Sequence, residues 1–184
     1  MPESVVTLQL SQLLQNGSSA SPGADDLASL DALQLCIHAE RDKFVSRRLA
    51  EEGIWEPYES ALVLQMLEPG QVFVDVGANI GYFSLLAAHR VGATGAVMAF
   101  EPDPGNHALL VRSATANGFN QVIHAELAGL AECDGEATLY LSEDNLGDHQ
   151  ICATGQQRDT LPIRLLQGGA FLGSRVSRLD LVTI

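Results

Sequence analysis

The residues best suited to chemistry in this sequence form a glycine-containing turn. The turn, GANIG at residues 77–81, follows a short apolar run, VFVDV at residues 72–76. Glycine adopts positive φ angles at no steric cost, and asparagine resists them less than most residues do. Such a turn lets a ligand approach the backbone closely. We therefore expect the whole turn, Gly77 to Gly81, to form the floor of a ligand site.

The spacing of the glycines disfavours two common phosphate-binding loops. A dinucleotide-binding turn has the pattern G-x-G-x-x-G, but Asn79 and Tyr82 stand at its second and third glycine positions. The pattern G-x-x-x-x-G-K-[ST] of nucleoside triphosphatases is absent from the sequence. The turn therefore offers no pyrophosphate-binding loop, and the ligand that it predicts need not carry phosphate. An enzyme acting on dinucleotides or nucleotide sugars is the alternative that the missing glycines disfavour.

Two acidic residues near the turn indicate which groups the ligand carries. Glu101 ends the next apolar run, twenty residues beyond Gly81, where a carboxylate accepts hydrogen bonds from both hydroxyls of a ribose. Asp75, two residues before Gly77, places a negative charge beside the turn, which suits an ammonium or sulfonium group. S-adenosylmethionine has a ribose, an ammonium and a sulfonium and lacks phosphate. It is the cofactor that this pattern predicts.

Alternating strand and helix patterns surround these residues. We expect strands at 72–76, 96–100, 122–125 and 179–184 and helices at 59–67, 80–91 and 104–117. Strands that alternate with helices predict an α/β fold with a doubly wound, Rossmann-like parallel sheet and right-handed crossovers. Ligands bind such sheets at the carboxyl ends of the strands, where the turn and Glu101 lie.

The remaining segments have weaker patterns. Three strand-like pieces without helices between them predict antiparallel pairing: 137–141, 150–153 and 161–166. Residues 1–52 are expected to form a partly helical extension, with a helix at 27–35, a second one before Gly53 and a flexible joint near 16–25. The short apolar segment from Val5 to Leu14 is either a docked helix or loose.

Composition limits the class of protein. The chain has 184 residues, of which 46% are hydrophobic, enough for one domain with a core. Its net charge of −13 predicts that neither nucleic acid nor an anionic membrane surface is a partner. The absence of a basic, apolar leader predicts a cytoplasmic protein. The three cysteines lack metal-ligand spacing, so no metal site is expected.

Three stretches of the sequence carry a family likeness: FVDVGANIGYFSLLAA, GAVMAFEPDPGNHALL and ANGFNQVIHAELAGLAECDGEATLYLSEDNLGDHQI. In this order they resemble the FkbM family of S-adenosylmethionine-dependent methyltransferases, which have the class I methyltransferase fold. The resemblance spans roughly residues 53–184, with GIWEP at 53–57 similar to the family's lead-in to the first strand. It implies a methyltransferase domain over this range and O-methylation of a small-molecule or carbohydrate hydroxyl. The cofactor-binding set is then Asp75, Gly77, Ala78, Asn79, Gly81, Glu101 and Pro102.

The acceptor half of the site has a weaker signature. Methyl transfer mainly requires that the nucleophile and the methyl group are held in line, and its general base need not belong to a motif. The stretch SEDNLGDH at 142–149 resembles the family's acceptor-side loop, so Asp148 and His149 are candidate bases. Alternatively, both residues end a turn and face water. Tyr58 and Glu59 are further candidates for cofactor contact, although helix-start chemistry explains Glu59 equally well.

Relatives with this motif continue past the fourth strand, whereas this sequence ends there. We therefore expect a sheet that is incomplete on the C-terminal side, with its fourth strand beside the first. Residues 179–184 would then form an open apolar edge suited to self-association. A binding or assembly module without catalytic activity is the alternative to a methyltransferase.

Overall fold

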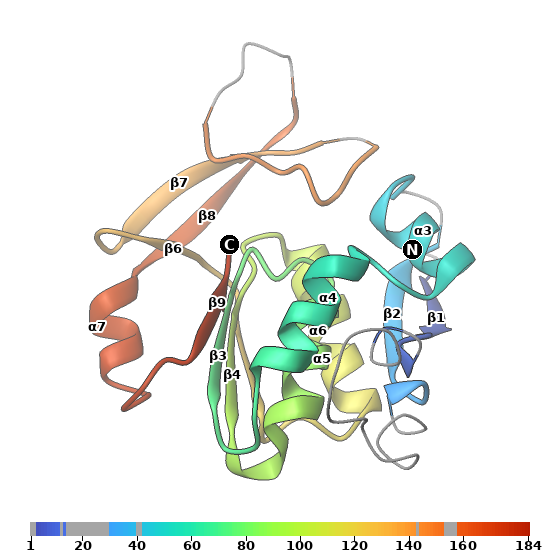
Figure 1. Cartoon of the computed structure of the whole chain (residues 1–184). Coiled ribbons are helices and arrows are strands. Elements are labelled where there is room, and N and C mark those ends of the chain that lie inside the picture. Colours follow the sequence, from blue (N-terminus) through green and yellow to red (C-terminus); the bar gives the residue numbers. More distant parts are fainter. Residues whose placement is uncertain (1–2, 12, 14–29, 40–41, 143, 153–157) are drawn as a thin grey trace.

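A parallel four-stranded sheet forms the centre of the protein (Figure 1). The computed structural model describes residues 3–11, 13, 30–39, 42–142, 144–152 and 158–184. The sheet has the order β5-β4-β3-β9, so the predicted place of the fourth strand beside the first is confirmed. Its strands are β3 (Val72–Val76), β4 (Ala96–Phe100), β5 (Ile123–Glu126) and β9 (Leu181–Thr183).

Helices cover both faces of this sheet, which explains the nearly continuous apolar sequence of β3 and β4. On one face lie α4 (Pro57–Met66), α5 (Tyr82–Val91) and α6 (Pro104–Ala116), and on the other lies α7 (Gly168–Gly173) (Figure 1). The predicted helices at 59–67, 80–91 and 104–117 are thus confirmed, with small differences at their ends. Helix α7 was not expected, because GGAFLG is too short to show a helical period.

The N-terminal extension differs from its prediction. It contains an antiparallel pair, β1 (Glu3–Thr7) and β2 (Gln34–His38), followed by α3 (Val45–Glu52). The helix expected at 27–35 is wrong at its end, where β2 begins. The segment from Val5 to Leu14, expected to be a docked helix or loose, begins with the last three residues of β1. A short apolar run does not distinguish a buried strand from a buried helix, and β2 packs against α6. The joint near 16–25 lies outside the described residues.

A second, three-stranded sheet has the order β6-β8-β7. Its strands are β6 (Gly129–Ala131), β7 (Gly135–Tyr140) and β8 (Thr160–Gln167). The antiparallel pairing of β7 with β8 confirms the prediction, whereas β6 was missed and pairs parallel to β8. In the part of 150–153 that the structure describes, the expected strand is reduced to a single bridge between Gln150 and Tyr140.

The extension shares its core with the main domain. Leu10, Leu35 and Leu49 are buried in the same apolar cluster as Phe73 and Leu85. A smaller cluster beneath α7 joins its residues to β3 and β4. None of the helices that the structure describes is long and apolar enough to cross a membrane.

Candidate functional site

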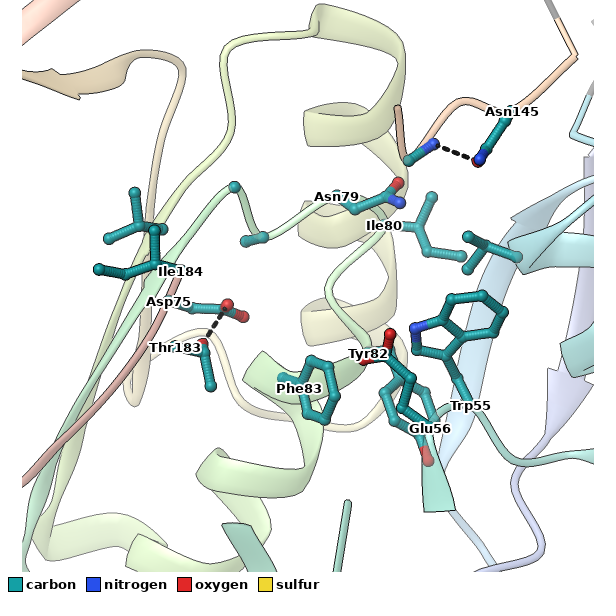
Figure 2. Close-up of a pocket in the computed structure, with 15 residues that line it drawn as sticks. Trp55, Glu56, Asp75, Asn79, Ile80, Tyr82, Phe83, Asn145, Thr183 and Ile184 are labelled. Carbon is teal, nitrogen blue, oxygen red and sulfur yellow. Dashed lines mark hydrogen bonds between the residues drawn. The ribbon is translucent and has the colours of Figure 1, made fainter. Parts of the chain in front are cut away.

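A cavity of about 300 Å³ opens at the carboxyl end of β3 (Figure 2). Its floor is the turn at residues 77–81, and we call residues 144–149, which lie above this turn, the roof. Residues Gly77 to Ile80 of the floor and Asn145 and Gly147 of the roof line the cavity. A bound molecule would therefore contact both. This is the edge of a parallel sheet at which ligands are expected.

The floor has the backbone conformation that its sequence predicts. The φ angles are 74° at Gly77, 51° at Asn79 and 89° at Gly81. A Cβ atom at Gly81 would lie 2.8 Å from Cγ of Leu110 in α6, so close packing also requires glycine there. A Cβ at Gly77 would have no heavy atom of the protein within 4 Å, because this glycine faces open space. The two glycines thus have different roles.

Glu101 lies directly beside the floor, as predicted. One of its carboxyl oxygens accepts a hydrogen bond from the Asn79 N–H (2.7 Å), and the other accepts one from the Asp103 N–H (2.8 Å). Burial raises the pKa of Glu101 to about 7, against the lowering effect of these two bonds. Each oxygen retains a second lone pair, so the carboxylate still has acceptor capacity for hydroxyl groups. Pro102 follows it, half-buried.

Asp75 lies on the other side of the floor and lines the cavity. It accepts hydrogen bonds from the hydroxyls of Ser84 in α5 (2.6 Å) and Thr183 in β9 (2.8 Å). Its pKa is raised because burial disfavours the charged form. Asp75 therefore connects β3 with β9 and α5 at the cavity. It also lies where its negative charge would attract a cationic ligand (Figure 2).

The walls contain residues that sequence reasoning missed. Trp55 and Glu56 line the cavity, whereas the neighbouring candidates Tyr58 and Glu59 are exposed on α4 and do not line it. Glu56 has a φ of 43°, and among the described residues only it and Asn79 combine a side chain with a positive φ. Burial, together with the charge of Glu59, raises the pKa of Glu56. The one sequence feature that could have indicated Trp55 and Glu56 is the stretch GIWEP at 53–57, in which a proline follows the acidic residue.

The opposite parts of the wall come from α5, from β9 and from the residue that follows β9. Tyr82, Phe83, Thr183 and Ile184 line the cavity there. The Tyr82 hydroxyl is 2.9 Å from the Ser60 Oγ, which donates to the Trp55 carbonyl oxygen at 2.6 Å. This pair of bonds fixes the aromatic wall between α4 and α5.

The two candidate bases lie in the roof but do not line the cavity. Asp148 forms an ion pair with Arg158 (2.8 Å), and this hydrogen bond lowers the pKa of Asp148, which makes it a weaker base. His149 accepts a hydrogen bond at Nδ1 from the Ser142 N–H (3.0 Å), and its Nε2 is 4.0 Å from Asp103. A base role for either residue stays a prediction.

The polar groups of the cavity fit a cationic ligand. Its charged lining residues are Glu56 and Asp75, and no lysine, arginine or histidine of the described chain lines it. The side-chain oxygen of Asn79 is buried and has no hydrogen-bond partner. A buried acceptor without a partner costs free energy until a donor reaches it. An ammonium or sulfonium group suits this lining, whereas a phosphate does not.

Comparison with known families identifies one match. Residues 75–179 match the family model described as the methyltransferase FkbM domain. This range begins at Asp75 and contains the floor, Glu101 and the roof. No curated protein matches the chain.

Solved structures that are similar to the chain include several methyltransferases. A SAM-dependent O-methyltransferase from Thermotoga maritima is 25% identical over 40% of this chain and 29% of its own, with a TM-score of 0.37. P. horikoshii TYW2 in complex with MeSAdo is 22% identical over 52% of this chain and 33% of its own, with a TM-score of 0.42. The complex of aTrm5 and tRNALeu is 20% identical over 53% of this chain and 26% of its own, with a TM-score of 0.42. The chain thus spans a third or less of the length of each of these proteins.

One of these structures corrects a prediction made from composition. The sequence was expected to exclude nucleic acid as a partner because of its net charge of −13. This exclusion is wrong, because a structure similar to the chain is a complex with tRNA. Net charge sums over the whole chain, whereas nucleic acid is bound by a local surface. The acceptor is therefore not established by the charge of the chain.

Proposed function

The chain belongs to the FkbM family of S-adenosylmethionine-dependent methyltransferases, and we propose that it methylates a hydroxyl group of a small molecule or sugar. The observation that carries this proposal is the lining of the cavity. It combines two acidic side chains with Asn79, whose buried side-chain oxygen has no hydrogen-bond partner, beside a turn that has no phosphate-binding pattern. S-adenosylmethionine is a nucleoside cofactor that carries two cationic groups and no phosphate, as this lining requires.

Residues from both sides of the floor would hold the cofactor. Glu101 has acceptor capacity left for the ribose hydroxyls, and the Asn79 side-chain oxygen would accept a hydrogen bond from the ammonium group. Asp75 and Glu56 provide negative potential for the sulfonium. When bound, the cofactor supplies an electrophilic methyl group.

The chain itself contributes position and a dry environment. Trp55, Phe83 and Ile184 line the cavity with apolar surface, and this surface excludes water from the reacting groups. Holding an acceptor hydroxyl in line with the methyl group lowers the barrier by converting a bimolecular step into one within a complex. His149 and Asp148 stay the candidate bases for the acceptor proton.

A module that binds the cofactor without catalysis is the second candidate function. One observation favours it: neither candidate base lines the cavity, and both already take part in hydrogen bonds or ion pairs. Mass spectrometry of products from a panel of neutral sugars and phenols distinguishes the two functions. A methylated product supports the enzyme, and cofactor binding without any product supports the module.

Calorimetric titration tests the cofactor assignment. We expect S-adenosylmethionine and its demethylated product S-adenosylhomocysteine to bind, whereas NAD⁺ and ATP do not. Glu101→Ala should abolish binding, and Glu136→Ala, which removes an exposed acid from β7, should leave it unchanged. A folded wild-type chain that binds neither adenosine compound would overturn the proposal, as would equal affinities for wild type and Glu101→Ala.

A further inference from the structure

The roof is attached to parts of the chain that lie far from it in sequence. The Lys43 N–H donates to the Asp144 carbonyl oxygen (2.9 Å), and the Lys43 ammonium contacts the Asp144 carboxylate (2.6 Å). At the middle of the roof, the side-chain amide of Asn106 in α6 donates to the Leu146 carbonyl oxygen (3.2 Å). The first contact is exposed, and the second is buried.

Asn106 is a buried polar residue in the first turn of α6. Its side chain is buried, with 1% of the residue exposed, and it has two partners in different segments. Its oxygen is 2.8 Å from Nε2 of His38 in β2, and because its amide nitrogen faces Leu146, that ring nitrogen is the donor. Asn106 thus connects the N-terminal strand pair to the roof. Buried polar groups with all partners in place fix one arrangement of their surroundings.

The same residue is connected to the floor through the backbone. The Asn106 N–H donates to the Asp103 carboxylate (2.8 Å), and the Asp103 N–H donates to Glu101 (2.8 Å). Glu101 in turn accepts from the Asn79 N–H at 2.7 Å. The start of α6 therefore contacts floor and roof through successive hydrogen bonds.

The roof comes close to the floor at Gly147, the residue after Leu146, whose carbonyl oxygen accepts the Asn106 hydrogen bond. A Cβ atom at Gly147 would lie 3.2 Å from the Asn79 amide nitrogen and 3.2 Å from Cγ2 of Val45, which also lines the cavity. A methyl group added at Gly147 would therefore push the roof and the floor apart by a few tenths of an ångström. Leu146, whose carbonyl Asn106 holds, is the preceding residue.

We propose that Asn106 is a positioning residue that holds the roof over the floor and thereby sets how tightly a ligand is enclosed. Through His38, the N-terminal extension takes part in the same function. Asn106 acts through Leu146 and Gly147 and does not line the cavity itself. The effect on ligand affinity rests on the proposed function, whereas the effect on the roof does not.

The test compares Asn106→Asp with a matched variant in the same helix. Aspartate keeps the oxygen that His38 contacts but replaces the amide donor with an oxygen that repels the Leu146 carbonyl. Asn117, at the other end of α6, binds Gln34 of β2 through both its side-chain nitrogen (2.7 Å) and its side-chain oxygen (2.9 Å), so its described bonds lie on the β2 side of the helix and not at the roof. Asn117→Asp therefore disturbs the packing of α6 on β2 without touching the roof.

Two measurements separate positioning from general destabilisation. Amide hydrogen exchange of residues 144–149, followed by mass spectrometry without ligand, should become about tenfold faster in Asn106→Asp. S-adenosylhomocysteine should bind about tenfold more weakly, as measured by the fluorescence of Trp55, the single tryptophan, which lines the cavity. In Asn117→Asp both quantities should match the wild type.

Equal exchange and equal affinity in the two variants would overturn the inference. If the wild type itself binds no adenosine compound, the proposed function fails, and roof exchange alone decides the inference. Should Asn106→Asp not fold, Gly147→Ala replaces it, because its added methyl group presses on Asn79 and Val45, which line the cavity. We expect this variant to weaken binding about tenfold at unchanged thermal stability, and an unchanged affinity would contradict the role of the roof.

Discussion

The floor and the roof of the cavity are held by different kinds of contact. In the floor, the N–H groups of Gly77 and Ala78 donate to the Phe100 carbonyl oxygen, at 2.9 and 3.0 Å, across two adjacent strands. In the roof, the attachment depends mostly on side chains, from Asn106 in α6 and from Lys43 before α3, with one main-chain bond from the Lys43 N–H to the Asp144 carbonyl oxygen. The floor is thus part of the main-chain framework of the sheet, whereas the roof is added to it.

Because of this difference, the floor and the roof should tolerate amino-acid substitutions to different degrees. A floor residue has its backbone angles fixed by the turn, so a side chain there either strains the backbone or occupies the cavity. A roof contact can be lost while the sheet and its core stay intact. Floor substitutions should therefore cost free energy of unfolding or ligand affinity outright, and roof substitutions should have small effects on stability.

The largest effect is expected for Gly81→Ala. The new Cβ would lie 2.8 Å from a side-chain atom of Leu110 and 3.3 Å from its Cα, at a φ of 89°. Backbone strain and overpacking together should lower the free energy of unfolding by about 4 kcal/mol. Urea denaturation measures this loss. A loss below about 1 kcal/mol would show that α6 moves freely relative to the floor.

The second-largest effect is a pH dependence of the free energy of unfolding that arises from Glu101. Its folded pKa of about 7 lies above the ordinary value of 4.5, so the folded state binds the proton more tightly. The stability from this group is complete below pH 4.5 and is lost as pH rises through 7, by up to about 3 kcal/mol. Glu101→Gln removes this loss, so the stability of the wild type relative to the variant should fall between pH 5 and pH 8.

Ligand affinity should change in the opposite direction over the same range. Ribose hydroxyls donate to the ionised carboxylate, so binding of S-adenosylhomocysteine to the wild type should strengthen as pH rises through 7. The variant should bind weakly at every pH. Denaturation and titration at pH 5, 6, 7 and 8 measure both trends. A difference in stability that is independent of pH would contradict a buried, ligand-binding acid.

Gly77→Ala should have a smaller effect on stability than Gly81→Ala and a clear effect on binding. Its φ of 74° costs about 1 kcal/mol for alanine, but its Cβ meets no protein atom within 4 Å. The methyl group would occupy ligand space, so affinity for S-adenosylhomocysteine should fall more than about tenfold. Calorimetric titration measures the affinity. Unchanged binding would place the ligand away from the floor.

Lys43→Ala should have the smallest effect. The ion pair with Asp144 is exposed, with 59% of each side chain accessible, and the main-chain bond between the two residues persists without it. Thermal denaturation should show a loss of about 0.5 kcal/mol or less, and high salt should remove the difference. A loss above about 2 kcal/mol would mean that the roof is part of the folding core.

The floor could be predicted from the sequence because its backbone conformation is local and depends on the residue types in the turn itself. Gly77, Asn79 and Gly81 have the positive φ angles that their residue types favour, and Glu101 follows the adjacent strand. The parallel sheet and its helices were predicted for the same reason, since their apolar periods and turn residues are local. The position of Glu101 beside Asn79 followed from the topology of neighbouring parallel strands.

The roof and the walls were harder to predict because long-range contacts determine them. Asn106 and Leu146 are 40 residues apart, and Lys43 and Asp144 are 101 residues apart. No local pattern marks such pairs. The first two residues of β2 were predicted as the end of a helix, because the spacing of the apolar residues alone does not show that α6 packs against this strand. The contribution of Trp55 and Glu56 to the walls depends on the strained backbone at Glu56, which only the structure shows.

A crystal structure of the chain with S-adenosylhomocysteine tests the central claim most directly. We expect the ribose hydroxyls within hydrogen-bond distance of Glu101 and the amino group near the Asn79 side-chain oxygen, with the ligand enclosed between floor and roof. A ligand bound outside this cavity, or a Glu101 carboxylate that contacts only Asn79 and Asp103 in the complex, would contradict the account.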